Sequence, residues 1–192
     1  MSTLWVLSYL SVGDKNMDLT RVSRYLSLIL RHKPEVAGIE LDKHGWAKVS
    51  ELLPAMKIDM ETLEEIVRTD EKGRYSFNDD HSKIRANQGH SIDVDVELER
   101  QYFMPAVLYH GTSWKNVDSI MKTGINSGGR KYVHLSGDKE TALKVGKRHG
   151  KPVVLEIDTF RMHINGFIFY KSKNGVYLTE HVPAEYITIL KE

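Results

Sequence analysis

Apolar and polar positions follow a helical pattern from Asp18 onward. The apolar residues of this first segment are Leu19, Val22, Leu26, Ile29 and Leu30. Their spacing of three or four residues places them on one face of an α-helix. Asp18 is a favourable N-cap residue, and Lys33-Pro34 stops the pattern because proline cannot continue a helix. We therefore predict a helix that ends in the cationic pair Arg31-His32.

Two shorter helices and a hairpin are expected next. Apolar spacing predicts one helix at Val49–Ala55 and another that Asp59 caps and that continues through Val67. Residues 74–77 and 83–86 have strand-like composition and flank the turn residues Asn78-Asp79-Asp80. Helices followed by a hairpin are the ingredients of a winged-helix module.

The second half of the chain is richer in short β-type runs. Acidic residues alternate with apolar ones at 93–99, which indicates a strand or a solvated connector, and we place a lobe boundary at 99–105. Helices are expected at 114–122 and 138–148, each followed by a glycine. The expected strands lie at 107–109, 132–135, 153–157, 167–170, 176–178 and 186–190. This order predicts an α+β fold with a tail at 1–16, a winged-helix-like lobe at 17–100 and a second lobe at 101–192.

Charge and composition narrow the possible partners. The 192 residues include 27 basic and 26 acidic side chains, so a net charge of +1 argues against indiscriminate binding of polyanions. Cysteine is absent, which excludes disulfides and thiolate chemistry. The apolar segment Leu4–Val12 lacks a basic leader and is too short to span a bilayer. We expect a cytoplasmic monomer without a membrane anchor.

Arginine in three compact motifs indicates a phosphate-handling site. Arg31-His32 ends the first helix, Arg85 lies in the second hairpin strand, and Arg130 follows a double glycine. The planar guanidinium binds phosphate oxygens two at a time and stays charged at any physiological pH. The alternative for Arg31-His32 is that the negative end of the helix dipole holds the two cations there. Position alone does not separate these interpretations.

Tyr109-His110-Gly111-Thr112 forms a polar motif at the end of a predicted strand. Glycine lets a ligand approach the backbone closely, and His110 offers a directional hydrogen bond. The alternative is a turn in which the hydroxyl of Thr112 or Ser113 caps the following helix. His134-Leu135-Ser136 repeats the strand-borne polar pattern, which favours a binding role.

Together these motifs resemble the RNA 2′-phosphotransferase family, which removes a 2′-phosphate from RNA using NAD. The resemblance extends from about Met17 to Leu190. It rests on Leu30-Arg31-His32, Ile84-Arg85-Ala86, Gln88-Gly89-His90-Ser91, Tyr109-His110-Gly111-Thr112, Arg130 with Val133-His134-Leu135-Ser136, and Asn174-Gly175-Val176-Tyr177-Leu178-Thr179.

The resemblance implies a fold and a set of functional residues. The N-terminal winged-helix-like lobe would stand beside a C-terminal lobe of the ADP-ribosyltransferase fold, a mixed α/β lobe that binds NAD. The implied catalytic set is Arg31, His32, Arg85 and Arg130. The implied dinucleotide-binding positions are His110, Gly111, Thr112, His134, Leu135 and Ser136.

The resemblance also implies a two-step reaction in which NAD is consumed as a co-substrate. RNA that carries a 2′-phosphate, such as RNA from tRNA splicing, would first be ADP-ribosylated on that phosphate with release of nicotinamide. Transesterification would then give ADP-ribose 1″,2″-cyclic phosphate and RNA with a 2′-hydroxyl. We expect the three arginines to converge on the transferred phosphate.

One position departs from the wider ADP-ribosyltransferase pattern. Many protein-modifying members carry a catalytic glutamate on a late strand, where this chain has Val176. A phosphate monoester is already largely dianionic at neutral pH, so it needs no carboxylate to become a nucleophile. A glutamate there would instead repel it.

Two other functions compete with this hypothesis. One is a non-catalytic winged-helix regulator that binds nucleic acid, and the other is an ADP-ribosyltransferase that caps nucleic-acid phosphate ends and stops after the first step. The remaining histidines show no metal-ligand spacing, so we expect no metal site. The basic run Lys144–His149 is interpreted as a solvated helix end rather than an RNA contact.

Overall fold

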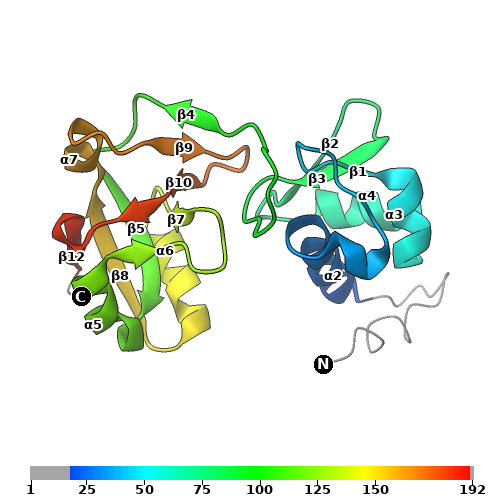
Figure 1. Cartoon of the computed structure of the whole chain (residues 1–192). Helices are drawn as coiled ribbons and strands as arrows, with labels where there is room; N and C mark the ends of the chain where they lie inside the picture. Colours follow the sequence, from blue (N-terminus) through cyan, green and yellow to red (C-terminus); the bar gives the residue numbers. More distant parts are fainter. Residues whose placement is uncertain (1–17, 191–192) are drawn as a thin grey trace. The chain divides into compact units, whose positions relative to one another are not determined.

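The computed structural model describes residues 18–190 and divides the chain into two compact units (Figure 1). The division falls between Glu97 and Leu98. The predicted tail at 1–16 lies outside the described residues. Both units mix helices with small antiparallel sheets, which confirms the α+β class.

The first helix of unit 1 forms where the apolar pattern predicts it. Helix α2 spans Leu19–Arg31, and the Asp18 carboxylate accepts hydrogen bonds from the backbone N–H groups of Thr20 and Arg21 at 3.0 and 3.3 Å. The 3₁₀ helix η1 (Pro34–Ala37) follows directly. Arg31 is therefore the last helical residue and His32 is the C-cap, as expected from Lys33-Pro34.

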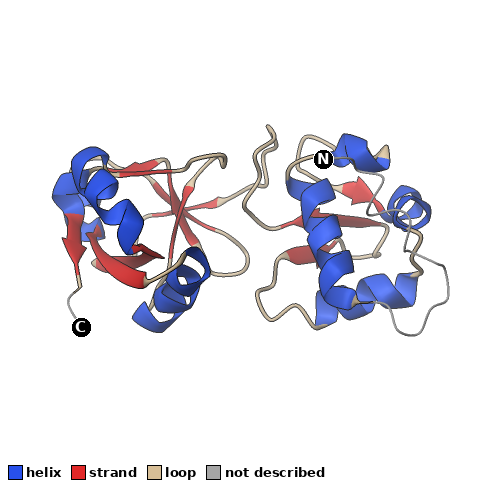
Figure 2. Cartoon of the chain, turned by 90° about the horizontal axis from the view of Figure 1, so that it is seen from below, coloured by secondary structure: helices blue, strands red, loops and turns tan. Residues whose placement is uncertain are grey.

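The rest of unit 1 is two helices and a three-stranded sheet (Figure 2). Helices α3 (Val49–Met56) and α4 (Met60–Arg68) match the prediction, and Asp59 caps α4 by accepting from Thr62 N–H at 2.9 Å. The predicted hairpin is confirmed. The strands are β1 (Ala47–Lys48), β2 (Tyr75–Phe77) and β3 (Lys83–Ala86), all antiparallel in the order β1-β3-β2.

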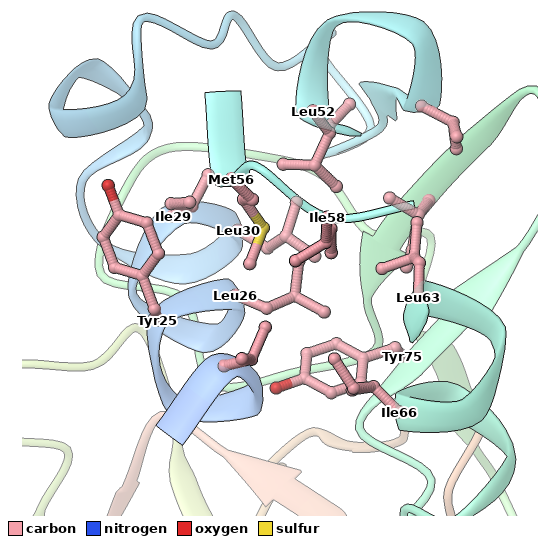
Figure 3. Close-up of a cluster of buried hydrophobic side chains, with 14 of the residues drawn as sticks. Tyr25, Leu26, Ile29, Leu30, Leu52, Met56, Ile58, Leu63, Ile66 and Tyr75 are labelled. Carbon is pink, nitrogen blue, oxygen red and sulfur yellow. The ribbon is translucent and has the colours of Figure 1, made fainter. Parts of the chain in front are cut away.

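One apolar core holds the helices of unit 1 on the sheet (Figure 3). Leu26, Ile29 and Leu30 from α2 meet Leu52 and Met56 from α3, and all five are fully buried. Each buried aliphatic side chain of this size contributes about 1.5–3 kcal/mol. The helical spacing read from the sequence therefore describes the face that packs, and Arg31 follows directly from it.

Unit 2 contains a four-stranded, a three-stranded and a two-stranded sheet, all antiparallel. The four-stranded sheet has the order β4-β9-β10-β7, and the three-stranded sheet has the order β12-β8-β5. The strands are β4 (Glu99–Gln101), β5 (Val107–Ser113), β6 (Ile125–Asn126), β7 (Val133–Leu135), β8 (Pro152–Asp158), β9 (Phe169–Lys171), β10 (Tyr177–Thr179), β11 (His181–Val182) and β12 (Ile187–Ile189).

The helices of unit 2 are shorter than their sequence patterns indicate. The predicted helix at 114–122 begins as the 3₁₀ helix η2 (Trp114–Asn116) before α5 (Val117–Thr123). The helix predicted at 138–148 is α6 (Lys139–Gly146) followed by the 3₁₀ helix η3 (Lys147–His149). The remaining helices are α7 (Thr159–Ile164) and the 3₁₀ helix η4 (Ala184–Tyr186), neither of which the sequence pattern predicted.

A close backbone contact joins α6 to β5. A Cβ added at Gly111 in β5 would lie 1.6 Å from the carbonyl oxygen of Ala142, and one added at Gly146 would lie 2.6 Å from the carbonyl oxygen of Thr112. Both separations are far inside van der Waals contact. The glycines are therefore required for the helix to lie this close to the strand.

Gly111→Ala should destabilise the protein by about 3 kcal/mol, the upper end of the usual cost of overpacking, because the methyl group has no space beside Ala142. Urea unfolding followed by circular dichroism measures the change. Gly129→Ala is the control, since no atom lies within 4 Å of a Cβ built there. Equal stability of the two variants would contradict the packing argument.

Candidate functional site

Arg31 is buried although it carries a full charge. It is 8% exposed, and a Cβ built on Gly89 would lie 3.6 Å from its Nη1. Gly89 has φ +88°, so the loop after β3 runs past the guanidinium in a conformation that favours glycine. A cation held only by the helix dipole would remain in solvent, so the dipole alone does not explain this burial, and the binding role of Arg31 stays a prediction.

The loop after β3 also holds His32. Ser91 Oγ lies 2.9 Å from His32 Nδ1, and the Ser91 N–H donates to the Arg31 carbonyl at 3.0 Å. A hydroxyl can donate or accept, so it is compatible with either neutral tautomer of the imidazole. His32 can therefore present a donor or an acceptor at Nε2 while its ring orientation is maintained.

Arg85 lies on β3 and is only 4% exposed. Its Nη1 donates to the Glu97 carboxylate at 3.0 Å and to the His44 carbonyl at 3.4 Å. Its guanidinium also lies over the Trp46 ring, 4.5 Å from the centroid. The buried Nε makes no hydrogen bond with the part of the chain that the structure describes. The ion pair with Glu97 and the hydrogen bond to the His44 carbonyl thus satisfy Nη1 of the guanidinium.

Sequence reasoning missed Ser91 as the partner of His32, and Glu97 and Trp46 as the partners of Arg85. Each contact joins residues 12 to 59 positions apart. Ser91 belongs to a motif already recognised, which was the available signal. No sequence pattern indicates that the acidic connector would place Glu97 on a buried arginine.

In unit 2 the structure brings the two histidine motifs together. An isolated bridge links β5 to Ser136, with Tyr109 N–H donating to the Ser136 carbonyl at 2.9 Å and the reverse bond measuring 2.7 Å. His110 Nδ1 lies 3.2 Å from the His134 carbonyl, and His134 Nδ1 lies 3.0 Å from the Tyr132 carbonyl. A carbonyl only accepts, so Nδ1 of each ring carries a proton, and in the neutral form of either ring Nε2 is the acceptor nitrogen.

The environment of His110 keeps its ring neutral. Burial lowers the pKa of His110, the hydrogen bond to the His134 carbonyl opposes that shift, and the charge of His149 lowers the pKa further. Because the net pKa lies below its ordinary value, His110 is uncharged at neutral pH. A neutral acceptor of this kind suits a ribose hydroxyl or an amide N–H better than an anion.

Three of the positions expected to bind a dinucleotide pack inside unit 2. Leu135 is buried in its core, and Gly111 faces α6. Thr112 is buried, and its Oγ1 accepts from Asn116 Nδ2 at 3.1 Å. The expected capping hydroxyl is absent in this region, because neither η2 nor α5 has a side-chain cap and β5 continues through Ser113. A binding role for these three positions stays a prediction.

Arg130 belongs to the segment between β6 and β7 in unit 2. Its side chain is exposed, although desolvation by its surroundings lowers the pKa of its guanidinium. The group remains charged at neutral pH. Arg31 and Arg85 belong to unit 1, so convergence of the three arginines remains a prediction.

Two findings concern metal ligands and membrane spans within residues 18–190. No group of three or more histidine, aspartate or glutamate side chains there could hold a metal ion. No helix in that range is long and apolar enough to cross a bilayer.

Comparison with known proteins identifies the family. The family model described as RNA 2′-phosphotransferase, Tpt1 / KptA family, matches residues 17–181. The chain belongs to this family. The activity of the family is RNA 2′-phosphotransfer, so the resemblance and the enzyme class read from the motifs are confirmed.

Bacterial relatives match nearly end to end. A protein of Fusobacterium nucleatum named "Probable RNA 2′-phosphotransferase" is 50% identical over 173 residues, covering 87% of this chain and 96% of its own length. Relatives of the same name from Acaryochloris marina and Flavobacterium johnsoniae are 47% and 46% identical, covering 89% and 86% of this chain and 97% and 93% of their own lengths.

His110→Gln should reduce the loss of stability on acidification. The pKa of His110 is lower in the folded protein than in the unfolded chain, so the unfolded state binds more protons below about pH 6.5 and stability falls as pH decreases. The slope from this one residue is at most about 1.4 kcal/mol per pH unit. Urea unfolding of both proteins at pH 7.5 and at about pH 5.5 measures it. A wild-type loss no larger than that of the variant would contradict the assignment.

Proposed function

We propose that the protein removes the 2′-phosphate from RNA with NAD as co-substrate, in two steps. The observation that carries this proposal is the pair of buried arginines on α2 and β3 within a chain of this family, together with His32 held by Ser91. Arginine side chains bind phosphate oxygens through several N–H groups at once, and a phosphate monoester brings nearly two negative charges to them.

We propose that the two units have separate tasks. Unit 1, with three helices and a β1-β3-β2 sheet, matches the composition of a winged helix and would bind RNA. Unit 2, with its two larger antiparallel sheets, would be the ADP-ribosyltransferase-like lobe that binds NAD. His110 and His134, joined through the bridge between β5 and the β7 segment, support this assignment.

The residues of unit 2 fit the polar parts of a dinucleotide. The acceptor nitrogens of His110 and His134 suit ribose hydroxyls or the nicotinamide carboxamide, and Ser136 adds a hydroxyl beside them. Gly111, Thr112 and Leu135 would act by shaping β5 and β7 rather than by side-chain contact. NAD supplies the electrophilic ribose carbon and the nicotinamide leaving group.

In the first step the RNA 2′-phosphate attacks the ribose carbon that bears nicotinamide. A bond forms between a phosphate oxygen and that carbon, the C–N bond to nicotinamide breaks, and nicotinamide leaves with the bonding electrons. The phosphate is already a strong enough nucleophile, so the protein contributes position rather than a base. Arg31 and Arg85 would hold the phosphate, and Val176 leaves the site without the carboxylate that would repel it.

In the second step the neighbouring 2″-hydroxyl of the ribose attacks the phosphorus. The bond from phosphorus to the RNA 2′-oxygen breaks, which releases RNA with a 2′-hydroxyl and ADP-ribose 1″,2″-cyclic phosphate. Negative charge builds on the phosphorus oxygens in this transition state, so Arg85 and Arg130 would stabilise it. His32 would donate a hydrogen bond or transfer a proton to the departing oxygen.

The full reaction is tested by incubating the protein with NAD and an RNA that carries one internal 2′-phosphate. Mass spectrometry should then find nicotinamide, dephosphorylated RNA and the cyclic phosphate. Without NAD, the RNA should keep its phosphate. Persistence of an ADP-ribosylated RNA would instead identify an end-capping enzyme, and binding without any product would identify a regulator.

Arg130→Ala should slow the second step more than the first, because additional negative charge builds on the phosphorus oxygens only in that step. Loss of one such electrostatic contact costs roughly 100- to 1000-fold in rate. RNA with a radiolabelled 2′-phosphate should therefore accumulate as the ADP-ribosylated intermediate, visible by gel electrophoresis. Arg161→Ala, an exposed arginine of the same unit, serves as the control. Equal slowing of both steps by Arg130→Ala would refute this division of roles.

A further inference from the structure

An exposed basic turn in unit 2 is not used by the reaction described above. It consists of Lys147, Arg148, His149 and Lys151, which connect α6 to β8 and are all exposed. We call these four residues the basic turn. Trp114, directly after β5, is also exposed at 46%.

The antiparallel pairing of β5 with β8 places Trp114 against this turn. Ser113 is opposite Pro152 in the ladder, and the Trp114 N–H donates to the Lys151 carbonyl at 3.0 Å. A Cβ built on Gly150 would lie 3.7 Å from the Cβ of Ser113. Trp114 and the basic turn therefore lie on adjacent backbone at one end of unit 2, where β5 ends and β8 begins (Figure 1).

Compensation of the helix dipole does not explain the whole turn. Lys144 lies in the last turn of α6 and pairs with Glu140 at 2.8 Å, and Lys147 is the C-cap residue. Arg148 lies in η3, the 3₁₀ turn that follows α6, and Lys151 lies beyond that turn; neither forms an ion pair with residues 18–190. The interpretation of Lys144–His149 as a solvated helix end is compatible with this geometry, but it does not extend to Lys151.

The basic turn also adjoins the candidate NAD site. His149 is close enough to His110 for its charge to disfavour protonation of that ring. His110 is on β5, four residues before Trp114. In the proposed first step the NAD ribose meets the RNA phosphate, so nucleotides next to that phosphate would come near this part of unit 2.

We propose that the basic turn and Trp114 bind the single-stranded RNA that flanks the 2′-phosphorylated nucleotide. This inference rests on the proposed function. The cations would contact backbone phosphates, and the Trp114 ring would stack on one unpaired base. Cationic grooves with exposed aromatic rings are the usual means of binding single strands without sequence preference. A duplex would not offer the base face that Trp114 needs.

The test compares a long RNA of about 12 nucleotides, within the range of single-strand site sizes, with a 2′-phosphorylated dinucleotide. The double variant Lys147→Gln/Arg148→Gln should raise KM for the long RNA about tenfold and leave kcat unchanged. Both parameters for the dinucleotide should stay at wild-type values. The slope of log Kd against log salt for the long RNA should decrease in magnitude by about 1.4, or 0.7 for each lost phosphate contact.

Trp114→Ala should weaken binding of the long RNA about fivefold or more, measured by fluorescence anisotropy, and Trp114→Phe should restore most of it because a ring still stacks. The matched charge control is Lys122→Gln/Arg161→Gln, which removes one exposed lysine and one exposed arginine elsewhere in unit 2. It should bind both RNAs like the wild type.

Three outcomes would overturn the inference. The first is an equal rise in KM for the long RNA and for the dinucleotide. The second is a rise in KM for the long RNA in the control variant that equals the rise in Lys147→Gln/Arg148→Gln. The third is weaker NAD binding in Lys147→Gln/Arg148→Gln, which would assign the turn to the dinucleotide site. Failure of the proposed function is distinguishable, because the wild type would then release no nicotinamide while the anisotropy measurements still report on RNA binding.

Discussion

The buried positive charge of Arg85 is the constraint on which the proposed chemistry of unit 1 depends. A guanidinium removed from water must be compensated by an opposite charge, hydrogen bonds or an aromatic face. Arg85 has one partner of each kind, in Glu97, the His44 carbonyl and Trp46. These partners satisfy Nη1 and one face but leave the buried Nε without a bond to the described residues. A phosphate dianion would complete the coordination that the fold begins.

The loop after β3 explains how unit 1 holds its three functional groups. Gly89 passes the guanidinium of Arg31, Ser91 bonds to His32, and Glu97 reaches Arg85. One short segment therefore contacts every catalytic side chain proposed for this unit. Because the same loop contacts Arg31, His32 and Arg85, a change in the loop would alter the positions of all three side chains.

In unit 2, strand β5 positions the functional side chains, and its two faces have different contacts. Successive residues of a strand point to opposite sides, so His110 and Gly111 face different environments. Helix α6 packs against the Gly111 side, and His110 turns toward the segment of His134. The absence of a side chain at Gly111 thus allows the helix to stabilise the strand that positions His110. This packing role of Gly111 does not depend on any ligand.

The sequence by itself determined the helices of unit 1, the hairpin, the order of most strands and the family, since apolar periodicity, capping residues and contiguous motifs are local features. It also identified Arg31, His32 and Arg85 as candidates. Only the tertiary structure decided that Glu97 and Trp46 flank Arg85, that Ser91 holds His32, and that Gly111 faces Ala142. The physical reason is that burial and hydrogen bonding between distant segments depend on how the backbone packs, and no short-range pattern of residues encodes that packing.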